Sequence, residues 1–116
     1  MQIHVHTDNN IDGTDEMTAH VEREVAAALS RFSDHLTRVE VHLSDESAGR
    51  VTDADIRCMI EARPERQTPV TVTDDAGSVD AALKGAIHRL NHLLASQEGR
   101  QQDENARTSI RGHTDQ

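Results

Sequence analysis

Hydrophobic residues recur along the chain with two different periods, and each period predicts one kind of secondary structure. Alternation of apolar and polar residues runs over residues 2–6, 37–44, 53–62 and 70–73, as is typical of strands with one buried face. Between and after these stretches, apolar residues are spaced three and four apart, as is typical of amphipathic helices. The predicted order is therefore strand, helix, three strands and helix.

The two predicted helices have clear starting points. Thr14 or Asp15 can cap the first helix, which we expect to end near residues 33–35, and Ser78 can cap the second. The apolar stripe of the first helix consists of Met17, Val21, Val25, Ala28, Leu29 and Phe32. The stripe of the second consists of Val79, Ala82, Leu83, Ala86, Ile87, Leu90, Leu93 and Leu94.

The connections between these elements predict their arrangement. A strand–helix–strand unit makes residues 2–6 and 37–44 parallel with a right-handed crossover, whereas short loops make the remaining neighbours antiparallel. Each strand has only one apolar face, so both helices must cover the same side of the sheet. The sequence therefore predicts an α+β fold with two layers, βαβββα, in which two helices pack on one face of a four-stranded mixed sheet.

The apolar pattern stops near Gln97. Residues 97–116 contain one isolated Ile among polar residues, too little apolar surface to offset the entropy of ordering the segment. We therefore predict a folded domain over residues 1–96 and a disordered tail over residues 97–116.

Composition narrows the class of protein. The chain has 116 residues and a formal net charge of −9, with one Phe and no Trp or Tyr, which argues against recognition of nucleic acid by base stacking. The single Cys58 allows no internal disulfide, and no stretch has the pattern of a signal peptide or a membrane span. These features predict a cytoplasmic protein without a membrane partner, and they do not reveal the oligomeric state.

Basic side chains form rows on both predicted helices. Lys84, His88 and His92 are four residues apart, with Arg89 beside them, and Arg23 and Arg31 form a similar row on the first helix. If the helices lie side by side, these rows can line one groove and bind RNA phosphates. The alternative is an ordinary solvated helix surface. The candidate RNA-binding residues are Arg23, Arg31, Lys84, His88, Arg89 and His92.

Other residues are weaker candidates for a metal-binding or catalytic site. His4, His6 and His42 should share the open face of the sheet, where three imidazoles can bind Zn²⁺, although the sequence shows no second layer of supporting groups. Cys58 falls on an inward position and is expected to act as a small hydrophobe. The chain has no glycine-rich phosphate loop and no recognisable catalytic triad, so we expect no cofactor and no enzymatic activity.

Four segments, in order, resemble one known family. They are MQIHV at the start, SDHLTRVEVHL over residues 33–43, DADI over residues 53–56, and VDAALKGAIHRLNHLL over residues 79–94. Over about residues 1–96 the chain is similar to the ribosome hibernation-promoting factor and ribosome-associated inhibitor family, also called the sigma-54 modulation protein family. The resemblance implies a protein that docks on the small ribosomal subunit, fills the channel of messenger and transfer RNA, and silences idle ribosomes. It also implies the short form, because the chain ends before a dimerising C-terminal domain can fit.

The chain departs from that family in its charge. Ala19, Val25 and Ala28 stand where the family carries basic residues, His92 stands where Arg is usual, and residues 96–98 replace a basic run. Residues 1–96 carry 9 basic and 17 acidic residues, a net charge of −8. Two functions therefore stay open: a ribosome-associated translation inhibitor, or an acidic protein-binding module of the same fold that has lost ribosomal RNA binding.

The eight histidines leave a third possibility open. Their protonation would bring the formal net charge from −9 to −1, so the protein could bind ribosomes more strongly at low pH.

Overall fold

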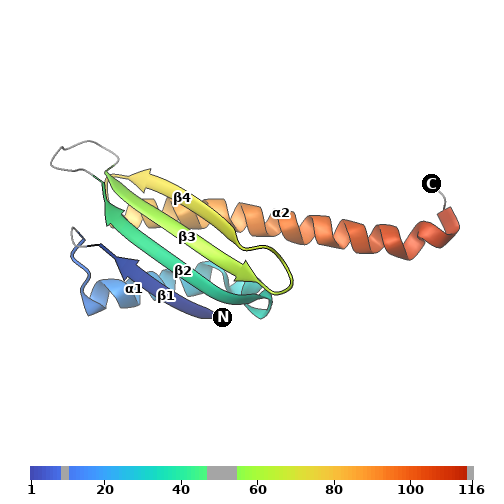
Figure 1. The fold of residues 1–116 in the computed structure, drawn as a ribbon, viewed down its shortest axis with the longest axis horizontal. Coiled ribbons are helices and arrows are strands. Elements are labelled where there is room, and N and C mark those ends of the chain that lie inside the picture. Colours follow the sequence, from blue (N-terminus) through green and yellow to red (C-terminus); the bar gives the residue numbers. More distant parts are fainter. Residues whose placement is uncertain (9–10, 47–54, 115–116) are drawn as a thin grey trace.

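The computed structural model describes the backbone of residues 1–8, 11–46 and 55–114, and the side chains of these ranges as far as Gly99. The elements follow the predicted order (Figure 1). They are β1 (Gln2–Thr7), α1 (Asp15–Ala28), a 3-10 helix η1 (Ser30–His35), β2 (Leu36–Asp45), β3 (Ile56–Pro64), β4 (Val70–Ala76) and α2 (Val79–Thr114). The predicted start of the third strand at residues 53–54 lies outside the described residues.

The four strands form one mixed sheet in the order β1-β2-β3-β4. β1 and β2 are parallel, with Val5 opposite Val41, and the other two pairs are antiparallel. Ile60 on β3 lies opposite both Val41 on β2 and Val72 on β4, so the apolar positions of the inner strands form a continuous row. This arrangement confirms the predicted topology and the α+β class.

Both helices lie on the same face of the sheet, as Figure 1 shows. Their apolar stripes meet the inward residues of the strands in a single core, which contains no buried polar side chain among the described residues. Removal of a large aliphatic side chain from water contributes roughly 1.5–3 kcal/mol, so this shared core is the main source of stability. It is built from Val21, Val25, Leu29, Phe32, Leu36, Val39, Val41, Leu43, Cys58, Ile60, Ala62, Val72, Ala82, Leu83, Ala86, Leu90 and Leu94.

Each helix begins at a residue whose side chain caps it. The Thr14 hydroxyl accepts a hydrogen bond from the Met17 N–H at 3.1 Å, and the Ser78 hydroxyl accepts one from the Ala81 N–H at 3.1 Å. α1 ends at Ala28, earlier than predicted, and the chain continues as η1. The tighter turn of a 3-10 helix keeps Phe32 on the core side, three residues after Leu29.

α2 is longer than the sequence predicted. Its backbone is helical to Thr114, whereas the apolar pattern placed the end of the helix near Gln97. Gln, Arg, Glu and Ala are good helix formers, so the helix can continue where its apolar stripe has stopped. The division into a domain of residues 1–96 and a tail of residues 97–116 stays a prediction. Within the described ranges, no helix is both long and apolar enough to cross a membrane.

Gly85 marks a close approach between α2 and β4. A Cβ atom at this position would overlap the carboxylate of Asp74, which lies against the helix there. The missing side chain of Gly85 therefore leaves room for Asp74 between the sheet edge and the helix.

We predict that Gly85→Ala acts differently with and without Asp74. In an Asp74→Ala background the substitution should raise the free energy of unfolding by about 1 kcal/mol, the usual difference in helix propensity. In the wild type the overlap with the carboxylate should cancel or reverse this gain. Urea denaturation gives the free energy of unfolding of the wild type, both single variants and the double variant. The four values measure the coupling between positions 74 and 85. An equal effect in both backgrounds would contradict the close approach.

Cys58 should give the protein a characteristic loss of stability in alkali. The thiol is completely buried, and burial, followed by the charge of Asp74, raises its pKa from 9.0 to about 12. Between these values the unfolded chain releases the thiol proton and the folded chain retains it, so the free energy of unfolding falls as pH rises. Urea denaturation above pH 9.0 should show a steeper decline for the wild type than for Cys58→Ala. If the free energy of unfolding falls equally with pH in both proteins, the pKa of Cys58 is not raised.

Candidate nucleic-acid interface

All six candidate RNA-binding side chains are exposed. Arg23 lies on α1, Arg31 on η1, and Lys84, His88, Arg89 and His92 on α2. None is turned into the core, because each falls between the apolar positions of its helix. The structure thus places them where an RNA ligand can reach them, but it gives them different surroundings.

The outer side of α2 carries a short row of Lys84, His88 and His92. The spacing of four residues keeps them on neighbouring turns, and the rings of His88 and His92 meet edge to face with their centroids 5.1 Å apart. Lys84 makes no ion pair with another side chain in the described ranges, and the same is true of Arg23. Among the six candidates, these two cations are therefore the arginine and lysine side chains already available to a phosphate.

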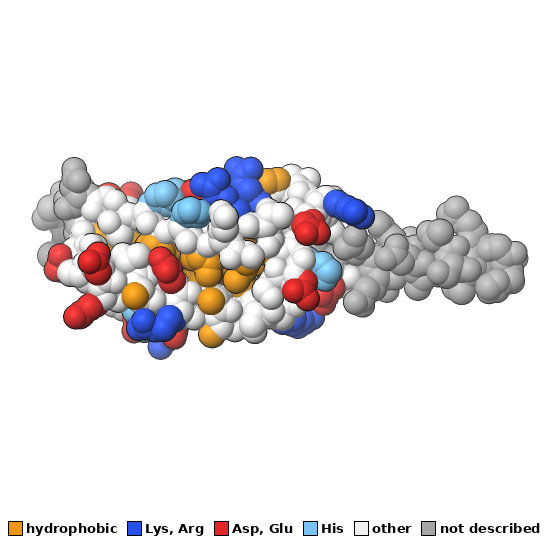
Figure 2. All heavy atoms as spheres, turned by 90° about the horizontal axis from the view of Figure 1, so that it is seen from below, with side chains coloured by type: hydrophobic (Ala, Val, Ile, Leu, Met, Phe, Trp, Pro, Cys, Tyr) orange, Lys and Arg blue, Asp and Glu red, His pale blue; other side chains and the backbone are white. Residues whose placement is uncertain are grey.

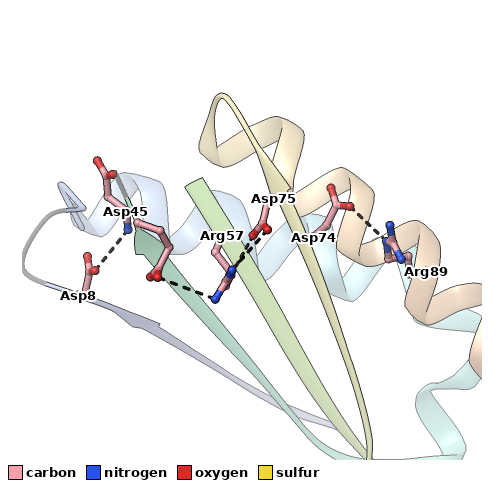
Figure 3. Close-up of polar contacts among 7 residues, drawn as sticks. Asp8, Asp45, Arg57, Asp74, Asp75 and Arg89 are labelled. Carbon is pink, nitrogen blue, oxygen red and sulfur yellow. Dashed lines mark hydrogen bonds and ion pairs between the residues drawn. The ribbon is translucent and has the colours of Figure 1, made fainter. Parts of the chain in front are cut away.

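Arg89 is turned toward the sheet and does not continue this row. Five residues of helix separate it from Lys84, which places it about 140° around α2. Its Nε donates a hydrogen bond to Oδ1 of Asp74 at 3.2 Å (Figure 3). The arginine side chain is 62% exposed and the Asp74 side chain 21% exposed. An acidic partner on β4 thus compensates part of the Arg89 charge.

Arg31 is likewise paired. Its Nη2 donates to Oε1 of Glu98 at 2.9 Å, and its guanidinium carbon lies 4.8 Å from the centre of the Phe32 ring. These contacts connect η1 to α2. Arg31 therefore has a structural use, and it can bind RNA only by exchanging the carboxylate of Glu98 for a phosphate.

The candidate residues border different hollows in the surface. Arg23 lines one with Met1 and Ile3, beside strand β1. His88, Arg89 and His92 line another with residues 71–73 of β4. β1 and β4 are opposite edges of the sheet. Arg23 and the group of His88, Arg89 and His92 thus border separate hollows at opposite edges of the sheet, and the single groove stays a prediction.

The open face of the sheet carries arginines that we had not considered as candidates. Arg57 donates from Nε to Oδ1 of Asp75 at 2.9 Å, and its Nη1 lies 3.9 Å from Oε1 of Glu46 (Figure 3). The hydrogen bond and charge of Asp75, together with the charge of Glu46, raise the pKa of Arg57. Arg38 and Arg63 are similarly paired with glutamates on their own strands. These three arginines are thus already paired with carboxylates.

His6, Glu40 and His42 lie together on the same open face. His6 Nε2 is 3.0 Å from Oε1 of Glu40, and His42 Nε2 is 4.0 Å from the same oxygen. Burial alone would raise the pKa of Glu40, but the hydrogen bond with His6 and the charges of Arg38 and both imidazoles lower it overall. The sequence predicted a cluster of His4, His6 and His42. In the structure Glu40 is the third member, and His4 is outside the group.

Charge on the described surface is mixed. Figure 2 shows histidine side chains beside Lys and Arg side chains along one margin, and Asp and Glu side chains distributed toward both ends. On this side, the described part of the molecule has no broad area of one sign. On this side, attraction to RNA must therefore come from a few cations at close range.

Comparisons with known proteins identify the family. The sequence matches the family model described as sigma 54 modulation protein / S30EA ribosomal protein over residues 3–102. A comparison with curated proteins finds no match. Among solved structures, the chain is similar to the Protein Y N-terminal domain of Thermus thermophilus, with a TM-score of 0.64, 26% identity, and coverage of 80% of this chain and 94% of that one.

A second similar structure is a ribosomal subunit interface protein from Coxiella burnetii. Its TM-score is 0.63 at 10% identity, with coverage of 85% of this chain and 99% of that one, a likeness that concerns the fold alone. The family match extends from β1 into α2 and includes all six candidate residues. The chain therefore belongs to the sigma-54 modulation protein / S30EA ribosomal protein family.

Proposed function

We propose that this protein is a ribosome-associated hibernation factor that binds the small ribosomal subunit and inhibits translation by occupying the channel of messenger and transfer RNA. The observation that carries the proposal is the family match over residues 3–102, which spans the whole sheet and the core-forming part of α2. The similarity to a ribosomal subunit interface protein adds support from the fold.

The proposed action is steric and not catalytic. A domain with one continuous apolar core keeps its shape when it is placed in a cleft, so its volume alone can exclude other ligands. It requires no cofactor and no bond-making step. The proposed site of action is the cytoplasm, where ribosomes assemble on messenger RNA.

The first contacts in this proposal come from Lys84 and Arg23, the two candidate cations that have no acidic partner in the described part of the chain. Each Lys or Arg that meets a phosphate releases bound counterions, which favours association at low salt. Arg89 and Arg31 join when they leave Asp74 and Glu98. Exposed ion pairs of this kind contribute only about 0–1 kcal/mol, so phosphates can displace the carboxylates at little cost.

The net charge of −9 restricts the orientation in which the domain can approach RNA. Acidic residues elsewhere on the domain are repelled by ribosomal RNA, and the repulsion acts over about 10 Å at 0.1 M salt. The domain should therefore dock in one orientation, with the outer side of α2 toward RNA. A surface with so few available cations makes the affinity sensitive to each of them.

We predict that Lys84→Gln with Arg89→Gln weakens binding to small ribosomal subunits at least tenfold. The slope of log affinity against log salt should become shallower by about 2, one for each lost phosphate contact. Sedimentation of the full chain with purified subunits across a salt series measures both quantities. The matched control is Arg38→Gln with Arg63→Gln, which removes the same charge from the open sheet face and should keep the wild-type slope.

Two outcomes of this experiment would count against the proposal. If the wild type fails to sediment with subunits at every salt concentration, the proposed function is wrong, and an acidic protein-binding module becomes the better reading. If both double variants lose affinity equally, the function can stand but Lys84 and Arg89 are not the contact residues.

Asp74 provides an independent test of Arg89. We predict that Asp74→Asn strengthens subunit binding severalfold, because Arg89 no longer has to leave a charged partner. In an Arg89→Gln background the same substitution should give a much smaller gain. The four proteins form a double-mutant cycle whose coupling is read from affinities at one salt concentration. Equal gains in the two backgrounds would show that Asp74 acts only through net charge.

A further inference from the structure

The sheet face opposite the helices brings three metal-ligating side chains together. His6, Glu40 and His42 each offer one ligand atom, and these atoms lie within 4.8 Å of one another. We propose that they form a binding site for a transition-metal ion of the zinc class. This site is separate from the outer side of α2 and does not depend on the proposed ribosomal function.

The pairing of β1 with β2 brings the three residues of the site together. Parallel pairing of β1 and β2 places His6 directly opposite His42, and Glu40 precedes His42 by two residues on the same strand. Side chains two residues apart on a strand point to the same face. All three therefore project from the face that the helices leave uncovered, and their backbone positions are fixed by neighbouring strands.

The ligand atoms lie near the spacing that a metal ion requires. His6 Nε2 and His42 Nε2 lie 3.0 Å and 4.0 Å from Oε1 of Glu40, and all three ligand atoms lie within 4.8 Å of one another. Tetrahedral zinc binds nitrogen and oxygen at about 2.0–2.2 Å, which separates neighbouring ligand atoms by about 3.3 Å. Side-chain rotation must therefore bring the three atoms around one ion.

The two imidazoles are arranged in parallel. Their ring centroids are 4.6 Å apart with an angle of 15° between the planes, and both Nε2 atoms face one carboxylate oxygen. Imidazole lone pairs lie in the ring planes, so rings stacked in this way direct theirs along nearly parallel lines. One ring must turn about its side-chain torsions for both Nε2 atoms to bind an ion held at Oε1 of Glu40.

Arg38 orients the carboxylate. Its Nε lies 3.1 Å from Oε2 of Glu40, which leaves Oε1 directed at the histidines. The Glu40 side chain is 17% exposed, whereas His6 and His42 are 48% and 40% exposed. Hydrogen bonds that fix a ligand in this way support metal sites in general.

The ligand set selects a class of ion. Two imidazole nitrogens and one carboxylate favour zinc and its neighbours over Mg²⁺ and Ca²⁺, which prefer oxygen ligands. Three protein ligands leave one tetrahedral position for water or for a group of a binding partner.

The test is titration of the full chain, purified without a histidine tag, with Zn²⁺ by calorimetry and with Co²⁺ by visible absorption. We expect one ion per chain and a visible absorption band that reports ligand geometry. His6→Gln with His42→Gln should lower the affinity at least tenfold. The matched control is His88→Gln with His92→Gln, which removes the other neighbouring pair of histidines, on α2, and should leave binding unchanged.

Two further variants define the ligand set. Glu40→Gln should weaken binding, whereas His4→Gln, which removes an imidazole from the same face of the same strand, should not. Circular dichroism shows whether each variant is folded, and zinc should raise the melting temperature of the wild type but not of the His6/His42 variant. The proposal is overturned if the wild type binds no stoichiometric ion, if the α2 pair abolishes binding, or if His4→Gln is as harmful as His6→Gln.

Discussion

Burial of one face of the sheet is the constraint on which the rest of the structure depends. The strands of this chain alternate over most of their length, so each has a single apolar side on which α1 and α2 bury their stripes. The domain therefore has two unlike exteriors, the outer sides of the helices and the uncovered face of the sheet. The proposed RNA contacts on α2 lie on the first exterior, and the proposed metal site lies on the second.

Ion pairing determines which charges on these exteriors are available. Arg31, Arg57 and Arg89 each lie against a carboxylate that is distant in sequence, and Asp74 reaches Arg89 because Gly85 leaves space for it. In an acidic chain most cations acquire such partners, which is why a count of basic residues overstates the attraction to RNA. Lys84 and the neighbouring histidines matter more than their number suggests, because no acidic partner competes for Lys84 within the described ranges.

The sequence predicted the features that depend on local pattern and missed those that depend on register. Alternation and three-four spacing located the strands and helices, and the connection through α1 made β1 and β2 parallel. The pairing of Arg31 with Glu98 spans 67 positions, and nothing local to either residue indicates it. The histidine cluster depends on side-chain direction as well as register: the offset of β1 against β2 places His4 opposite Glu40, but the Glu40 side chain reaches along the strand to His6, with Arg38 at its other oxygen. The early end of α1 follows from a 3-10 turn that preserves the same apolar spacing, so the pattern alone does not reveal it.

The two proposed sites lie on opposite exteriors, and this separation has a physical consequence. A domain that docks through the outer side of α2 keeps the uncovered face of the sheet away from the docking contact, so His6, Glu40 and His42 stay accessible in the bound state. A metal ion there would add positive charge to a face whose arginines are already neutralised, without disturbing the helices, because the inward residues of β1 and β2 form the layer between them. The fourth coordination position of the ion would then face solvent or a group of a binding partner. One sheet thus separates the surface proposed to contact phosphate from the surface proposed to bind a metal ion, and each can change in sequence without altering the core they share.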